Sequence, residues 1–352
     1  YYLRMKNFKF MILAAFAAVS FAFASCDKED SKETKADLTE LTAVVDSCQT
    51  VLKSATTADY PQAAITAFES TVNAAAKALA GNLNQTAADN MVVQLRAAAK
   101  TFAASAYDAI PEKALTFALT FDEGKGESLK TTGSYNWTAK FEKGPSEIFG
   151  TDTQLPQFVD GKVGKALYFD KGAHLEISDF AANMLEGSKL SIAVWVKPAE
   201  TRAGNYIISY NYWNSWKLNL QTENKPFFTV ATEKGVVDMD NETVQSVPND
   251  AWTHVALTMD LTAGEISFYI NGELTKTWTK ENKSDALTGT VKAYAAKLPL
   301  MIGVATTFEE ANSWSWAWDK VPASWDYFHG TLDELQVYNV ALTAGQVAKL
   351  AK

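Results

Sequence analysis

The chain has 352 residues, a formal net charge of −9 at pH 7 and two cysteines. This length is enough for two domains that each bury a sizeable core. The negative charge argues against a general nucleic-acid-binding protein, which would present a basic surface. Two cysteines can build neither a disulfide framework nor a cysteine-rich zinc site.

An export signal is predicted at residues 1–26. Lys6 and Lys9 form a positive start, and residues 10–23 form an apolar run that precedes small residues and Cys26. The run is shorter than the about 20 residues that a membrane-spanning helix needs, and a permanent anchor helix is the alternative. Residues 23–26, Phe-Ala-Ser-Cys, resemble a bacterial lipobox, which implies that Cys26 is lipidated and becomes the mature N-terminus.

A charged linker is predicted over residues 27–36. It begins with Asp27, Lys28, Glu29 and Asp30. An acidic run at this place resembles the surface-export signal of Bacteroidetes lipoproteins, and a solvated spacer is the alternative. The resemblance implies a protein that acyl chains hold in the outer membrane and that is exposed at the cell surface.

Three helices are predicted over residues 37–110. Apolar residues recur there at three- and four-residue steps, and Cys48 belongs to the first of these stripes, so we predict it to be a core residue. Asp59 is expected to cap the second helix, and the third is expected to begin near Asn84 or Thr86. Short loops predict an up-down-up bundle. We interpret the bundle as a spacer, with an interaction surface as the alternative.

A β domain is predicted over residues 113–352. From Leu115 onward apolar and polar residues alternate with a period of two, and glycines recur at short intervals as turn signals. The pair Asn271-Gly272 is the clearest tight hairpin. Many short strands at this spacing predict a mainly β, antiparallel two-sheet sandwich, and residues 343–352 predict a short helix at its end.

The last predicted strand carries a family resemblance. Residues 330–343, Gly-Thr-Leu-Asp-Glu-Leu-Gln-Val-Tyr-Asn-Val-Ala-Leu-Thr, resemble the closing strand of laminin-G-like, concanavalin-A-like jelly rolls. Three further parts of the chain fit the same family in order: residues 161–170, residues 190–196, and residues 252–257 with 264–272. The resemblance implies a jelly roll over about two thirds of the chain. It leaves the function to be argued from the site.

The sequence carries no catalytic pattern of the related glucanases. Those enzymes place acidic residues at alternate positions of one strand, so that two carboxylates share a face. No Glu-x-Asp-x-x-Glu occurs here, and the adjacent Asp333 and Glu334 are expected to point to opposite faces. There is no glycine-rich phosphate loop and no serine nucleophile elbow. We predict a protein without catalytic activity, in which His254 is a hydrogen-bonded core residue.

Two segments combine aromatic residues with asparagine, aspartate and serine. The predicted ligand-binding residues are Tyr210, Tyr212, Trp213, Trp216, Trp314, Trp316, Trp318 and Trp325. Sugar rings present apolar C–H faces and hydroxyl edges, so flat aromatic rings beside polar side chains suit a carbohydrate. We expect the two segments to meet and to leave at least two aromatic faces open, with Trp213, Trp314 and Trp316 as the first choices. The alternative is a loop whose tryptophans fill a gap over the sandwich.

Asp122 and Asp333 are the predicted metal ligands. An unpaired carboxylate buried in a strand is costly, so Asp333 needs a hydrogen-bond donor or a cation. In many of the jelly rolls that this domain resembles, a calcium ion joins the first and last strands, which implies a structural calcium at these two residues. Calcium takes six to eight oxygen ligands, so backbone carbonyls would supply the rest. A hydrogen-bonded acid without a metal is the alternative.

These observations predict a lipid-anchored surface protein that binds an oligo- or polysaccharide. Other surface lipoproteins are further predicted partners, and nucleic acid is not. An adhesion or protein-interaction module is the second hypothesis, and a concanavalin-like glycoside hydrolase is the third. Exposed aromatic rings would favour the glycan-binding protein, a flat apolar face the adhesion module, and carboxylates along a groove the enzyme.

Overall fold

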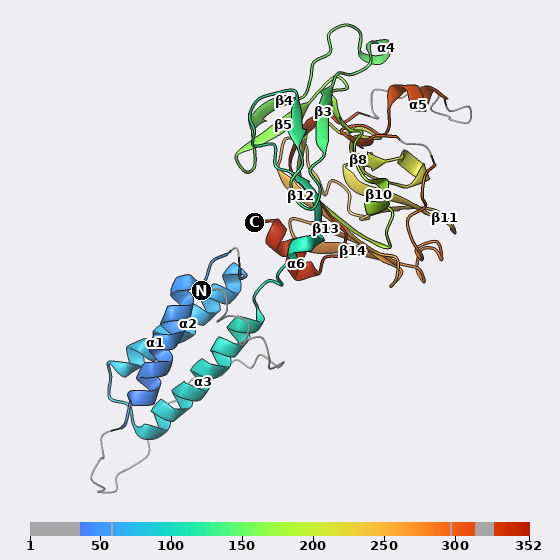
Figure 1. The fold of residues 1–352 in the computed structure, drawn as a ribbon. Coiled ribbons are helices and arrows are strands. Elements are labelled where there is room, and N and C mark those ends of the chain that lie inside the picture. The colour runs from blue at the N-terminus through green and yellow to red at the C-terminus, as the bar shows by residue number, and fades with distance from the viewer. Residues whose placement is uncertain (1–35, 58, 296–297, 314–326) are drawn as a thin grey trace, which may run out of the picture. The chain divides into compact units, whose positions relative to one another are not determined.

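The structure, a computed structural model, describes residues 36–57, 59–295, 298–313 and 327–352. The chain divides into two compact units, of which the first ends at Tyr107 and includes Lys352, and the second is Asp108–Ala351. The first unit is helical and the second consists mainly of strands (Figure 1). Among the described residues, no helix has the length and the apolar composition that crossing a membrane requires.

The first unit consists of three helices, α1 (Thr39–Ser54), α2 (Gln62–Leu79) and α3 (Gln85–Ala104). Its core contains Leu41, Val45, Cys48, Phe68, Val72, Val92, Leu95 and Phe102. The predicted helical region and the burial of Cys48 are thus confirmed. Asn84 caps α3 by accepting a hydrogen bond from the amide of Ala87 at 2.8 Å. The expected cap at Asp59 is wrong, because Pro61 directly precedes α2 and Asp59 accepts from the hydroxyl of Thr56 instead.

The second unit is a sandwich of two antiparallel sheets. Sheet A contains, in spatial order, β14 (Glu273–Thr279), β13 (Glu265–Ile270), β12 (Thr253–Asp260), β7 (Lys189–Pro198), β16 (Gly330–Tyr338), β5 (Lys165–Phe169) and β4 (Gln157–Asp160), and β1 (Leu115–Leu119) also pairs with β16. Sheet B contains β11 (Gly235–Asp240), β10 (Lys225–Thr232), β9 (Trp216–Gln221), β8 (Tyr206–Tyr210), β15 (Leu300–Ile302), β6 (His174–Ile177), β3 (Thr138–Glu142) and β2 (Ser128–Lys130). The predicted two-sheet sandwich is confirmed.

Short helices connect the strands. They are η1 (Glu112–Ala114), α4 (Ser146–Phe149), η2 (Ala182–Met184), η3 (Tyr212–Asn214), α5 (Phe308–Ser313) and α6 (Ala344–Leu350). The hairpin between β13 and β14 turns at Asn271 and Gly272, whose φ angles of 52° and 82° are both positive. Two left-handed residues in succession are what a tight type I′ turn requires, so the predicted hairpin is confirmed.

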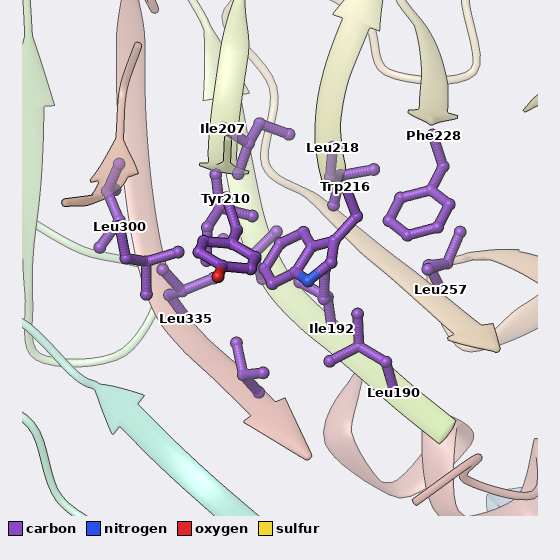
Figure 2. Close-up of a cluster of buried hydrophobic side chains, with 14 of the residues drawn as sticks. Leu190, Ile192, Ile207, Tyr210, Trp216, Leu218, Phe228, Leu257, Leu300 and Leu335 are labelled. Atoms are coloured by element: carbon purple, nitrogen blue, oxygen red, sulfur yellow. The ribbon is translucent and has the colours of Figure 1, made fainter. Parts of the chain in front are cut away.

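The core lies between the two sheets, because alternate side chains of each strand point toward the opposite sheet. Figure 2 shows Tyr210 and Trp216 of sheet B in one cluster with Ile192 and Leu257 of sheet A. Both aromatic rings are at most 1% exposed. The core therefore includes two of the aromatic residues that the sequence assigned to a ligand site.

A bulge in β16 changes which side chains face the core. Leu332 and Leu335 both belong to it, although they are three residues apart. The register shifts between Asp333 and Gln336, and Glu334 has a φ of 50°. An extra residue of this kind breaks the two-residue alternation of a strand.

Because of this bulge, Asp333 and Glu334 both lie on the outer side of sheet A. Asp333 is in register with Trp195, an outward residue of β7, and Glu334 accepts a hydrogen bond from Gln336 at 3.2 Å. The side chain of Gln336 in turn accepts from the hydroxyl of Tyr338. The expectation that the two acidic side chains point to opposite faces is wrong.

Part of the outer face of sheet A is covered by α6. This helix begins with a capping box formed by Thr343 and Gln346. Its buried Val347 packs with Ala193 of β7 and Tyr338 of β16. The predicted helix is confirmed, but its predicted place is wrong, because it packs on the outer face of sheet A and not against an end of the sandwich.

Candidate functional site

Polar residues line the outer face of β9, β10 and β11 in sheet B. In β9, Trp216 and Leu218 point into the core, so the intervening Lys217 points outward. Lys217 is in register with Thr229 of β10, and Thr229 is in register with Asp238 of β11. A row of polar side chains therefore crosses three neighbouring strands, and we call this part of the sheet the outer polar face.

Aromatic rings surround the ammonium group of Lys217. Its Nζ lies over the rings of Tyr206 at 5.2 Å, Tyr212 at 5.7 Å, Trp213 at 4.6 Å and Phe227 at 4.6 Å. It also donates a hydrogen bond to Asn219 Oδ1 at 3.1 Å. Lys217 is only 1% exposed. Ring faces are negative, so they attract a cation that has lost contact with water.

Trp213 is held in place by the strand beside it. Its indole Nε1 donates a hydrogen bond to Asp238 Oδ1 at 3.0 Å, and the same oxygen accepts from the hydroxyl of Thr229. Trp213 and Phe227 remain partly exposed, and Asp238 is exposed. The outer polar face therefore offers aromatic surface and a carboxylate within one hydrogen bond of each other.

The turn that carries Trp213 has an unusual backbone. Asn211 and Tyr212 have φ angles of 57° and 56°. The left-handed conformation costs free energy in residues other than glycine, so it persists only where the surroundings fix it. Here the amide of Tyr212 donates to the hydroxyl of Ser209 at 3.2 Å, and the rings of Tyr212 and Trp213 meet edge to face at 4.2 Å. These contacts place Trp213 over the outer polar face.

Tyr210 and Trp216 do not belong to this site, and their predicted role in stacking on a ligand is wrong. Trp216 donates its indole hydrogen bond to the carbonyl of Leu185 at 3.0 Å. The hydroxyl of Tyr210 donates to Glu186, and burial together with this carboxylate raises the pKa of Tyr210. Both rings pack among apolar side chains of the two sheets, where no ligand can reach their faces.

Tyr212 and Trp213, the other two predicted aromatic residues before residue 300, do lie at the outer polar face. Tyr212 is 5% exposed and packs with Tyr206 and Trp213. Its role is therefore to hold Trp213 in place by packing. The predicted residues Trp314, Trp316, Trp318 and Trp325 lie outside the described residues. That the two aromatic segments meet stays a prediction.

Sequence reasoning missed several residues of the outer polar face. They are Lys217, Asn219, Phe227, Thr229 and Asp238. A signal for two of them exists, since Lys217 and Asn219 alternate with three apolar residues in a short segment that starts at Trp216. The residues that β10 and β11 contribute to the face are brought together by strand pairing, which cannot be read from the sequence alone.

The predicted metal ligands both bind the turn between β4 and β5. Asp333 Oδ2 accepts a hydrogen bond from the amide of Val163 at 2.9 Å, and Asp122 Oδ1 accepts from the amide of Lys165 at 2.8 Å. Gly164, with a φ of 51°, lies so close that a Cβ there would be 2.0 Å from Asp122 Oδ1. The two acids thus bind the same hairpin to β16 and to the segment that follows β1.

One oxygen of Asp333 fits a cation. Asp333 is fully buried, and its Oδ1 has no hydrogen-bond partner in the described part of the chain. Burial raises the pKa of this carboxyl, backbone amides that bond to it oppose the rise, and the charge of Asp122 adds to it. Within the described residues, no group of three or more His, Cys, Asp or Glu side chains could hold a metal ion. A calcium ion here would therefore need backbone carbonyl ligands.

A second polar cluster joins the loop after β7 to the segment before β16. His329 Nδ1 lies 2.6 Å from Glu200 Oε1, and His329 Nε2 lies 2.9 Å from the hydroxyl of Tyr168. Arg202 donates to Glu200 and to the carbonyl of Tyr327. The hydrogen bonds from His329 and Arg202 hold the pKa of Glu200 below its usual value. We interpret this cluster as a structural link between the two segments.

His254 is buried, as predicted, but the predicted hydrogen bond of its ring is not found at Nδ1. Among the described residues, Nδ1 has no partner. The ring lies edge to face with Trp195 at 5.3 Å on the outer face of sheet A. Burial lowers the pKa of His254 to about 4, so the ring is neutral at pH 7.

Comparison with known proteins places this architecture in a family. A family model described as the concanavalin A-like lectin/glucanases superfamily, Laminin_G_3, matches residues 169–348. No curated protein matches the chain. Domain 4 of AbnA, a GH43 extracellular arabinanase from Geobacillus stearothermophilus solved in complex with arabinotriose, is 20% identical with a TM-score of 0.48, and the match covers 69% of this chain and 100% of that one.

Two toxin domains are also similar. The binding domain of Paraclostridial Mosquitocidal Protein 1 is 16% identical with a TM-score of 0.47, and the binding domain of botulinum neurotoxin serotype D/C is 16% identical with a TM-score of 0.45. Each match covers 68% of this chain and 52% of the toxin domain, so the chain spans about half the length of these domains. Because the family model matches about half of all its residues, the chain belongs to the Laminin_G_3 family of the concanavalin A-like lectin/glucanase superfamily.

Proposed function

We propose that the chain is a glycan-binding protein without catalytic activity, anchored by a lipid at the cell surface. The observation that carries the proposal is the pairing of Trp213 with Asp238 on the outer polar face, beside partly exposed Phe227. An aromatic face can stack on the C–H face of a sugar while the neighbouring carboxylate accepts hydrogen bonds from its hydroxyls. A core between two sheets needs neither a partly exposed tryptophan on the outer face nor the exposed carboxylate beside it.

The carboxylates of β11 support binding over hydrolysis. A glycosidase needs two carboxyl groups that flank one bond, with one of them protonated. Asp240 is 3.3 Å from the ammonium of Lys225, and Asp238 holds Trp213. Neither is thus arranged as the acid of a hydrolytic pair. An adhesion module that binds a protein would need a larger apolar area than this polar face offers.

The test is a titration of the protein with a panel of oligosaccharides, by calorimetry or by tryptophan fluorescence. We expect Trp213→Ala to weaken binding by roughly 5- to 150-fold, since stacking on an aromatic ring contributes about 1–3 kcal/mol where bases stack on aromatic side chains. The matched control is Trp252→Ala, which removes a partly exposed tryptophan that contacts Lys197 of sheet A instead. Unchanged affinity in the Trp213 variant, or no binding to any member of the panel, would refute the proposal.

Membrane anchoring is proposed through Cys26, which lies outside the described residues. Acyl chains on this residue would hold the protein in the outer membrane. We expect Cys26→Ala to move the protein from the membrane fraction to the soluble fraction, as followed by fractionation and immunoblotting. Cys48→Ala is the control, because Cys48 is buried in the helical bundle. A Cys26 variant that stays in the membrane with its signal cleaved would contradict the lipid anchor.

A structural calcium ion is proposed at Asp333 and Asp122, where it would satisfy the unpartnered Oδ1 of Asp333. An ion that binds only the native state raises the melting temperature in a concentration-dependent way. We expect calcium to raise the melting temperature of the wild type and not that of Asp333→Asn. Asp160→Asn is the control, since Asp160 is exposed and ion-paired to Lys165 on the same hairpin. If neither calcium nor a chelator changes the melting temperature of the wild type, the proposed calcium site is wrong.

A further inference from the structure

We propose that Asp238 restricts the outer polar face to uncharged glycans and excludes glycans that carry carboxylate or sulfate groups. This inference rests on the proposed function and adds the substrate class to it. It depends on the two oxygens of Asp238, which have different surroundings. Oδ1 is engaged by Trp213 and Thr229. Oδ2 has no hydrogen-bond partner in the described part of the chain, and the side chain is exposed.

The free oxygen is placed where a bound sugar would lie. Trp213 Nε1 is 3.0 Å from Asp238 Oδ1, so a ring stacked on the indole would have its edge near the carboxylate. Sugar hydroxyls can donate to Oδ2 in charge-assisted hydrogen bonds, which are stronger than neutral ones. A carboxylate or sulfate group on the same sugar would instead meet a like charge. If the two negative charges are about 5 Å apart near the protein surface, their repulsion lowers the affinity for the acidic glycan by roughly tenfold or more.

The ammonium groups nearest in the fold to Asp238 are already bonded within the protein and do not offer a direct contact to an acidic group of a glycan. Lys217 is buried and bonded to Asn219. Lys225 pairs with Asp240 at 3.3 Å, and Lys276 of β14 pairs with Glu242. Each of these ammonium groups is therefore engaged by an acceptor of the protein.

Two further lysines lie near β10. Lys234 donates to the hydroxyl of Thr288 at 2.6 Å. Lys292 is exposed, and its amide donates to the carbonyl of Ala231, the next outward residue of β10 after Thr229. Lys292 is an exposed cation that an acidic glycan could use, so it is included in the test.

The experiment titrates the full chain with pairs of oligosaccharides of the same linkage that differ in charge, such as β-1,4-mannan and β-1,4-mannuronan fragments, within a panel that also contains sulfated glycans. We expect the tightest binders to be uncharged and to bind at least tenfold more tightly than their acidic counterparts. Added salt should narrow this difference, because it screens the repulsion.

Asp238→Asn separates the charge from the geometry. The amide oxygen can still accept the hydrogen bond of Trp213, so the indole keeps its position, while the negative charge is gone. We expect this variant to bind acidic glycans about tenfold more tightly than the wild type does, and to lose at most a few-fold for uncharged ones. Asp238→Ala, which also removes the bond to Trp213, should weaken binding of both classes.

Three results would overturn the inference. They are an acidic glycan that binds the wild type at least as tightly as the best uncharged one, an unchanged selectivity in Asp238→Asn, and acidic binding that disappears in Lys292→Ala. In each case glycan binding itself would stand. If no glycan binds and Trp213→Ala has no effect, the proposed function fails, and the inference fails with it.

Discussion

Replacing Trp216 with alanine is expected to lower the free energy of unfolding of the β unit by about 3–5 kcal/mol. The indole is fully buried between the two sheets, and its truncation leaves both a cavity and an unpaired carbonyl at Leu185. Trp213→Ala should cost far less, because that ring is partly exposed. Denaturant unfolding followed by circular dichroism measures both.

Trp216→Phe is the matched variant for this experiment. It keeps most of the apolar volume and loses only the indole hydrogen bond, so it should lie between the wild type and Trp216→Ala in stability. A loss below about 1 kcal/mol in Trp216→Ala would mean that the ring is not part of a close-packed core. That result would instead support the sequence-based prediction that Trp216 belongs to a ligand site.

Acidification from pH 7 to pH 4 is expected to destabilise the β unit by about 3 kcal/mol through His254 alone. Burial lowers the pKa of His254 to about 4 in the folded protein, whereas an exposed histidine in the unfolded chain has a pKa near 6.5. Below pH 6.5 the unfolded state therefore binds a proton that the folded state does not bind. The free energy of unfolding therefore falls as the pH drops from about 6.5 to about 4. Below about pH 4 both states bind the proton, and His254 causes no further change.

His254→Leu isolates this effect, because leucine has a similar volume and no charge. The slope of unfolding free energy against pH between about 6.5 and 4 should be smaller in this variant than in the wild type. His174→Gln is the control, since His174 Nδ1 donates a hydrogen bond to the carbonyl of Gly172 at 2.7 Å. Equal slopes in the wild type and in His254→Leu would show that His254 does not stay neutral in the folded state.

The fold was largely predictable because its signals are local. The helical stripes predicted the burial of Cys48, and Asn271-Gly272 predicted the β13–β14 hairpin. Each depends on residues a few positions apart. The predicted two-residue alternation of β16 is wrong at Glu334, where the strand has a bulge. A bulge depends on how the strand pairs with its neighbour, and the sequence of one strand does not reveal that pairing.

The candidate site was only partly predictable, because a tryptophan suits a core as well as a ligand. Trp213 and Trp216 are three residues apart, yet one lies on the outer polar face and the other in the core. The left-handed residues Asn211 and Tyr212 turn the chain between Tyr210, which lies in the core, and Trp213, which lies on the outer polar face, and composition does not reveal such a turn. Asp238 was missed for another reason, since only the pairing of β10 with β11 brings it to Thr229.

Amide hydrogen exchange with and without the tightest-binding glycan tests the location of the site most directly. Binding slows exchange where a ligand stabilises or covers the backbone. We expect the protection to concentrate in η3 and in β9 to β11, which together carry Trp213, Phe227 and Asp238. Protection confined to the helical bundle or to sheet A, with none around Trp213, would contradict a glycan site on the outer polar face.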